Sequence, residues 1–328
     1  MIRFFKSGFP VQYVAICLTG LVLWGRVFFD PPPMPEPTGF VPFYSFLYYF
    51  LAGAPVLAVI LGFFLAIFSA FLLNYLLSSH DIVQKNSSLA GFIFIVLMSY
   101  SPSLLTLQPG NISVFFLLLI LWQLFKSYNR EEPYDLVYSA GFFAAAGSFF
   151  YFPFVFFFGF IFFSFIFVRV ANWREWIDSL LGFLTPFIFL SVYYFWFDLL
   201  PEKFVQYYSS INIELINLIP GDLFLMFSTL IIILYSLYTL ISGVRRLNEK
   251  TIEIRRKTLL LGWILFFVLA SIPFSSHLLL YSIEMMFIPF SGLIAIYFMR
   301  LKKYFWQELC FLLFLALLLL NNFFLLFS

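Results

Sequence analysis

The chain has 328 residues, of which 63% are hydrophobic and 10% are charged, and its mean hydropathy is +1.01. Soluble proteins carry about a quarter of their residues as charges, so this composition excludes a soluble enzyme and indicates a polytopic membrane protein. The 18 Lys and Arg nearly balance the 16 Asp and Glu, so the basic surplus typical of nucleic-acid binding is absent from the sequence. We therefore expect an all-α transmembrane helix bundle, a single integral membrane domain over residues 1–328, and no nucleic-acid partner.

The N-terminal part predicts two spans, a proline-rich loop and a short surface helix. The apolar run Val11–Phe29 has no small-residue cleavage site after it and predicts an uncleaved first span. Pro31–Pro42 cannot continue a helix, because proline lacks the N–H donor and its ring clashes with the preceding turn. We expect a rigid external loop there. The aromatic stretch Phe43–Phe50 then predicts an interfacial helix, and the run Pro55–Leu77 predicts the second span.

The next segment predicts a helical hairpin. Two apolar runs, Leu89–Leu107 and Ile112–Phe125, are separated by Gln108-Pro109-Gly110-Asn111, and these are residues that favour tight turns. We expect spans three and four to meet in this turn. Gln108 and Asn111, which flank it, are then interpreted as helix caps.

Three apolar runs between residues 139 and 197 predict spans five to seven. The first carries Ala140, Ala144 and Ser148 at four-residue spacing, a small-residue face that lets another helix backbone approach closely. Tyr151-Phe152-Pro153 predicts the turn to an uncharged, phenylalanine-rich run. Arg169–Trp176 is rich in arginine and tryptophan, which predicts a loop at the level of the lipid headgroups.

The remaining chain predicts a second external surface helix and four more spans. Residues 198–222 are polar with apolar residues interleaved, a pattern that indicates an interfacial helix. Span eight follows and ends near residue 241, and spans nine, ten and eleven begin near residues 258, 278 and 305. The basic stretch Arg245–Lys257 predicts a cytoplasmic loop in contact with anionic lipids. The bundle is therefore expected to have about 11 spans.

The distribution of basic residues predicts the orientation. Of the 18 Lys and Arg, all but Arg26 and Lys203 lie in alternate loops on one side of the predicted spans. Cytoplasmic loops keep an excess of Lys and Arg, so we expect a cytoplasmic N-terminus and an external C-terminus. The opposite, external side then carries most of its charge as carboxylates.

Four ionisable residues near predicted span ends are candidates for chemistry. Asp30 follows the first span, with Arg26 about one turn before it, so a carboxylate base would lie beside a guanidinium that binds lipid phosphate. The alternative is a snorkelling arginine and an aspartate that only starts the loop. His277 and Glu284 share one face of span ten with Tyr281 between them, and ionisable groups within spans are often functional. We interpret Glu284 as a second catalytic candidate and His277 as a second phosphate ligand. The alternative places His277 in a boundary turn and pairs Glu284 internally.

Metal and nucleotide sites have little support in the sequence. Cys17 and Cys310 both lie inside apolar runs, so neither a disulfide framework nor a thiolate metal site is predicted. The sequence carries no Walker motif, dinucleotide fingerprint or His-Glu-x-x-His motif. No metal site is predicted, and no particular cofactor is implied.

The sequences of four segments resemble those of a family of uncharacterised bacterial polytopic inner-membrane proteins. These segments are LQPGNISVFFLLLILWQLFKSY, SAGFFAAAGSFFYFP, NWREWIDSLLGFLTPFIF and VYYFWFDLLP. Members sometimes carry the name carotene monooxygenase, but carotenoid cleavage uses an iron held by several histidines and this chain has two. The resemblance implies residence in a bacterial inner membrane and brings no established activity.

A second resemblance is one of architecture. An acid in the first external loop, a following interfacial helix and a small-residue span after a charged cytoplasmic loop are similar to type C glycosyltransferases. Those enzymes transfer sugars from polyprenyl-phosphate donors at the external face, with an acid of the first loop as base or metal ligand. Asp30 stands at that position, although these enzymes commonly show paired acids there and a large external domain. The resemblance implies membrane lipids and a polyprenyl-phosphate-linked sugar as partners.

Two other functions remain open from the sequence. A non-catalytic subunit would anchor other membrane proteins of an envelope assembly through small-residue faces such as Ala140–Ser148. A transporter would need a site near the membrane midplane, formed by broken helices, and Glu284 with the Gly-Pro interruptions supports that reading.

Overall fold

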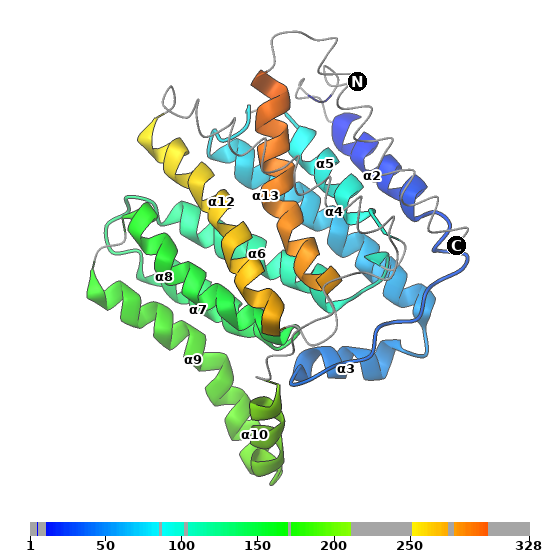
Figure 1. Ribbon diagram of the computed structural model, residues 1–328, viewed down its shortest axis with the longest axis vertical. Coiled ribbons are helices and arrows are strands. Elements are labelled where there is room, and N and C mark those ends of the chain that lie inside the picture. Colours follow the sequence, from blue (N-terminus) through cyan, green and yellow to red (C-terminus); the bar gives the residue numbers. More distant parts are fainter. Residues whose placement is uncertain are drawn as a thin grey trace.

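The computed structural model describes Phe5 and residues 11–84, 87–101, 104–169, 172–210, 251–274 and 279–300. Regular structure in these residues is helical throughout, as the composition predicts (Figure 1). The helices are α2 (Val11–Trp24), α3 (Pro42–Leu51), α4 (Pro55–Ser79), α5 (Leu89–Met98), α6 (Pro109–Lys126), α7 (Tyr134–Ser148), η2 (Phe152–Val155), α8 (Phe156–Val168), α9 (Trp173–Trp196), α10 (Leu200–Ser209), α12 (Ile252–Ser271), η4 (Ile272–Phe274) and α13 (Leu279–Arg300).

Several of these helices suggest membrane residence. Five of the described helical segments are long and apolar enough to cross a membrane: α4, α6, α9, Ile252–Phe274 and Tyr281–Met299. A crossing helix needs about 20 predominantly apolar residues. The helices α2 and α5 and the segment Phe152–Val168 are apolar but shorter. The predicted spans eight and eleven lie outside the described residues.

The centre of the bundle is formed by α4, α5, α6 and α13, which pack on one another (Figure 1). All ten residues of α5 are buried, so protein surrounds this helix on every side. This is why the helix is apolar around its whole circumference. The first predicted span, α2, packs on α4 and α5. Its helix ends at Trp24 and the chain turns between Gly25 and Asp30, five residues earlier than the apolar run predicts.

The predicted third span is wrong in its length. Helix α5 ends at Met98, and the described residues that follow, up to Gln108, contain no α-helix. This stretch is covered by α4: a Cβ on Gly62 would overlap the backbone of Thr106 and Leu107, and Leu107 N donates to Ala58 O (3.2 Å). Irregular backbone at membrane depth is tolerated only where protein or water satisfies its polar groups. A glycine on α4 therefore makes room for the break.

The predicted small-residue face of α7 is confirmed as a packing surface. Ala140, Ala144 and Ser148 are buried, and α7 packs tightly on both α9 and α6. The closest approach uses two glycines: a Cβ on Gly141 would overlap a carbonyl of α9, and a Cβ on Gly182 would overlap a carbonyl of α7. The two backbones are thus in direct contact, as in small-xxx-small helix pairs. The turn predicted at Tyr151 is also present and leads into η2.

Helix α9 lies at the edge of the bundle. Its buried residues form one narrow stripe, Glu175, Ser179, Gly182 and Pro186, which repeats every three to four residues and faces α7. The rest of its surface is half-buried or exposed and largely apolar, the composition expected of a helix side that faces lipid. Helix α10 follows it and has no buried residue. Helix α10 and the end of α9 that leads into it project from one end of the bundle, where α3 also lies (Figure 1).

Candidate functional site

Glu284 is a residue of α13, and its side chain lies in the bundle interior beside the N-terminal end of α6. Its side chain is fully buried, and Gln108 Nε2 donates to Glu284 Oε1 at 2.5 Å. The other carboxyl oxygen, Oε2, has no hydrogen-bond partner among the described residues. A Cβ on Gly110 would overlap this carboxyl group, so only glycine lets the α6 terminus come this close. The positive end of the α6 dipole favours a carboxyl group at this place.

The interpretation of Gln108 and Asn111 as caps is wrong. Gln108 is the N-cap residue of α6, but its side chain makes no capping bond; it donates to Glu284 and to Leu104 O (3.2 Å). Asn111 Nδ2 donates to Gly62 O on α4 (3.1 Å), and Asn111 Oδ1 is buried without a partner among the described residues. Both amides therefore connect α6 to neighbouring helices. Their partners Glu284 and Gly62 lie far away in the sequence, so the local spacing around residues 108–111 does not reveal these bonds.

Three buried tyrosines, Tyr44, Tyr151 and Tyr281, lie on this side of the bundle. Tyr151 hydrogen-bonds the Ser282 hydroxyl (2.9 Å), and its ring meets the edge of Tyr281 at 5.9 Å between centroids. Tyr44 of α3 donates to Pro35 O in the proline-rich loop (2.8 Å). Burial, with a smaller contribution from Tyr281, raises the pKa of Tyr44 well above its ordinary value. Its phenol therefore stays protonated and ties the loop to α3.

An apolar groove lies between α9, α10 and the end of the proline-rich loop. Its volume is about 520 Å³, a size typical of small-molecule sites. Lys203 brings a cation to its lining, and Lys203 Nζ donates to Gln206 Oε1 (3.1 Å). The groove is lined by Phe40, Phe183, Leu184, Phe187, Leu190, Ser191, Tyr194, Leu200, Lys203, Phe204 and Tyr207.

Hydrogen bonds dock the proline-rich loop on α10. Phe40 N donates to Ser210 Oγ (2.8 Å), and Gln206 Nε2 donates to Gly39 O (3.3 Å). The Phe40 ring packs edge-on against Tyr207 at 5.3 Å. Gly39 has a φ of +73°, a left-handed conformation that glycine adopts without strain. The loop that begins at Asp30 thus ends as one wall of the groove.

The turn at Tyr151 and Phe152 connects the buried group to the groove. Tyr151 faces Ser282 and Tyr281, as described above, whereas the Phe152 ring packs on the groove residue Tyr207 at 5.4 Å. The two features therefore lie on either side of one turn. Residues from helices far apart in sequence converge at this end of the bundle, which is where the sequence analysis expects the external face.

The structure does not bring all the predicted site residues together. Asp30 and Arg26 are exposed at the end of α2, where Asp30 N donates to Arg26 O (3.0 Å). Glu284 is enclosed in the bundle, and none of these three residues lines the groove. His277 lies outside the described residues. Within the described part of the chain, no three His, Cys, Asp or Glu residues are grouped as metal ligands.

Sequence reasoning missed a charged cluster at the opposite end of the bundle. Lys257, predicted in a loop, belongs to α12, and its side chain is only 2% exposed. Its ammonium donates to His80 Nδ1 (2.9 Å) and pairs with Glu253 (2.5 Å), and it lies 5.1 Å from the Tyr128 ring. Burial, followed by the Lys257 charge, lowers the pKa of His80 to about 4. The four-residue spacing of Glu253 and Lys257 was the available signal.

The groove was missed as well, although its helix was predicted. Residues 198–222 were interpreted as carrying an interfacial helix, and α10 is present there. The groove depends on Phe40, which lies more than a hundred residues earlier in the chain, so no local pattern could reveal it. No family model, no curated protein and no solved structure matches this chain.

Proposed function

We propose that this protein is a multi-pass enzyme of a bacterial inner membrane, with about 11 spans, that transfers a sugar from a polyprenyl-phosphate donor at the external face. The observation that carries the proposal is the docking of the Asp30 loop on α10, which makes Phe40 a wall of the apolar groove. A loop with a carboxylate at one end and an apolar groove at the other suits an amphiphilic substrate. The resemblance to type C glycosyltransferases implies the role of Asp30 as base and the polyprenyl-phosphate donor.

The proposed chemistry needs a base, a cation and an apolar channel. The polyprenyl chain lies in the groove, and Lys203 and Arg26 are the cations on this side for its phosphate. The acceptor hydroxyl oxygen forms a bond to the anomeric carbon as the bond from that carbon to the phosphate oxygen breaks. The phosphate leaves with the electron pair, and the acceptor proton passes to Asp30.

Glu284 has a positioning role in this proposal. Its carboxyl group is buried and accepts from Gln108, so it does not contact a substrate in the groove. It joins the start of α6 to α13, and Ser282 of the same helix bonds Tyr151 in the turn that carries Phe152. A rigid support of this kind holds groove and loop in register.

The test replaces Asp30 and compares it with a neighbouring acid. Asp30→Asn should lower sugar transfer by about 10²- to 10⁴-fold, the usual effect of removing a general base, with protein level unchanged. Glu36→Gln, an exposed acid of the same loop, is the control and should retain activity. The readout is lipid-linked sugar accumulated in a deletion strain that expresses each variant. Full complementation by Asp30→Asn would contradict the enzyme proposal and favour a non-catalytic subunit.

A transporter is the second candidate, and one observation favours it. The interruption between α5 and α6 places a helix N-terminus against a buried carboxyl oxygen that has no partner in the described residues. Broken helices with such termini form the ion and substrate sites of many transporters. Proton or sodium flux into proteoliposomes, abolished by Glu284→Gln but not by Asp30→Asn, would support this function over sugar transfer.

A further inference from the structure

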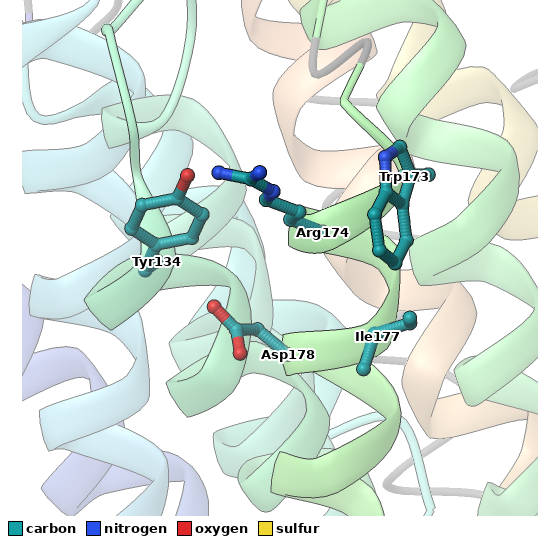
Figure 2. Close-up of a pocket in the computed structure, with 5 residues that line it drawn as sticks. All are labelled: Tyr134, Trp173, Arg174, Ile177 and Asp178. Carbon is teal, nitrogen blue, oxygen red and sulfur yellow. The ribbon is translucent and has the colours of Figure 1, made fainter.

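A second pocket lies where α7 and α9 begin, at the end of α9 away from α10. Its volume is about 430 Å³, and it is lined by Tyr134, Trp173, Arg174, Ile177 and Asp178 (Figure 2). Tyr134 starts α7, and the other four residues occupy the first turns of α9. The pocket is therefore framed by the two helices that meet at Gly141 and Gly182. It takes no part in the proposed sugar transfer.

The pocket presents two opposite charges, Arg174 and Asp178. Arg174 extends its guanidinium toward the Tyr134 hydroxyl, while the Asp178 carboxylate lies to the side of it (Figure 2). In the described part of the chain, no ion pair joins Arg174 to Asp178. A cation four residues before an anion is also the weaker order for pairing on a helix. Both charges remain available to a ligand that carries the complementary pair.

An apolar track leads away from the pocket along α9. Trp173 is 68% exposed and has the amphipathic ring typical of the membrane interface. Further along the helix the exposed apolar side chains continue toward the groove at Ile177, Leu180, Leu181 and Leu184. A ligand whose polar head occupies the pocket can therefore lay an acyl chain on this track.

We propose that the pocket binds the headgroup of a phospholipid that carries both a phosphodiester and a primary ammonium group. The phosphate accepts from the Arg174 guanidinium and the Tyr134 hydroxyl, and the ammonium donates to Asp178. Phosphatidylglycerol carries the phosphodiester but no cation to pair with Asp178. A quaternary ammonium has no N–H group to donate to a carboxylate. The pocket chemistry therefore selects phosphatidylethanolamine over phosphatidylglycerol and phosphatidylcholine.

Competitive lipid retention on the purified full chain tests this site. The protein is exchanged into an equimolar mixture of the three lipids, and retained lipid is counted by native mass spectrometry. The wild type should retain phosphatidylethanolamine about two- to fivefold over the other two, the ratio expected for an exposed ion pair. Asp178→Asn should remove the preference over phosphatidylglycerol, and Arg174→Gln should lower retention of all three.

Two further variants separate binding from folding. Tyr134→Phe removes only the hydroxyl and should reduce retention partially. The control is Asp135→Asn, an exposed acid in the same turn of α7 that lies 3.9 Å from Arg130, and it should leave the preference unchanged. Equal retention of the three lipids by the wild type would overturn the proposal. Displacement of the lipid by an equal concentration of soluble phosphoethanolamine would overturn the assignment to a lipid.

Discussion

Gln108 donates its side-chain amide to Glu284 across 176 residues of sequence, with 2.5 Å between Nε2 and Oε1. The bond joins the N-cap residue of α6 to the second turn of α13, and both helices lie at the centre of the bundle. A buried carboxyl group that loses its donor must bear the full cost of its desolvation. Replacing one or both members of this pair therefore measures how much one interhelical hydrogen bond contributes to the stability of the protein.

Gln108→Leu should destabilise the protein by about 1–3 kcal/mol, because Glu284 would keep no donor on either oxygen among the described residues. The measurement is the thermal unfolding temperature in detergent. The double variant Gln108→Leu/Glu284→Met replaces both partners with apolar groups and should regain most of the loss. Equal unfolding temperatures for the wild type and the single variant would show that the bond contributes nothing.

The contact of α7 with α9 predicts a large effect from a single methyl group. Gly182→Ala places a Cβ on the Tyr138 carbonyl, and overpacking of this kind costs about 1–3 kcal/mol. Gly53→Ala is the matched control, since a Cβ there meets no atom within 4 Å. Unfolding temperatures of both variants decide the matter. A Gly182→Ala protein as stable as Gly53→Ala would mean that the helices separate without cost.

The cluster at His80 predicts a loss of stability in acid. The folded pKa of His80 is about 4, below the ordinary value of 6.5 for histidine, so the unfolded chain binds more protons between these two values. Stability due to His80 is therefore fully present above pH 6.5 and is lost as pH falls toward 4. The unfolding temperature of the wild type should drop over this window, and that of His80→Gln should drop less. Parallel curves for the two proteins would assign the acid effect to other groups.

A bulky side chain introduced into the groove should block lipid binding. Ser191 lines the groove, whereas its neighbour Val192 is 58% exposed and lies outside it. Ser191→Trp should reduce both retention of polyprenyl phosphate and sugar transfer, because the indole fills the channel. Val192→Trp adds the same ring on the other side and should change neither. Similar retention by the two variants would argue that the chain binds elsewhere.

The predicted orientation implies that a reagent outside the cell reaches the loop that contains Glu36 but not the segment that contains Lys250. Single cysteines are placed at Glu36 and Lys250 after Cys17 and Cys310 are replaced by alanine. Glu36→Cys should react with a membrane-impermeant maleimide in intact cells, and Lys250→Cys should react only after permeabilisation. The physical reason is the distribution of Lys and Arg over alternate loops. External labelling at position 250 would reverse the topology.

Composition and small-residue spacing were enough to predict the helical bundle and the α7 face. The break after Met98 was missed because Leu89–Leu107 is apolar throughout, and an apolar run does not reveal whether protein or lipid covers its backbone. Pro102 was the local signal against a continuous helix. Gly62, which makes the break possible, lies on another helix. The same limit applies to the site, since Glu284 could be singled out as ionisable within a span, whereas its donor could not.

Pro186 separates a first half of α9, which packs on α7, from a second half that mainly lines the groove. Before it, the buried stripe of Glu175, Ser179 and Gly182 faces α7, and the two backbones meet at Gly141 and Gly182. Proline has no N–H to donate to the carbonyl four residues earlier, so bending at this point breaks one hydrogen bond fewer than elsewhere. Most of the groove residues of α9 come after this point. A bend at Pro186 would therefore change the width of the groove and leave the α7 contact of the first half in place.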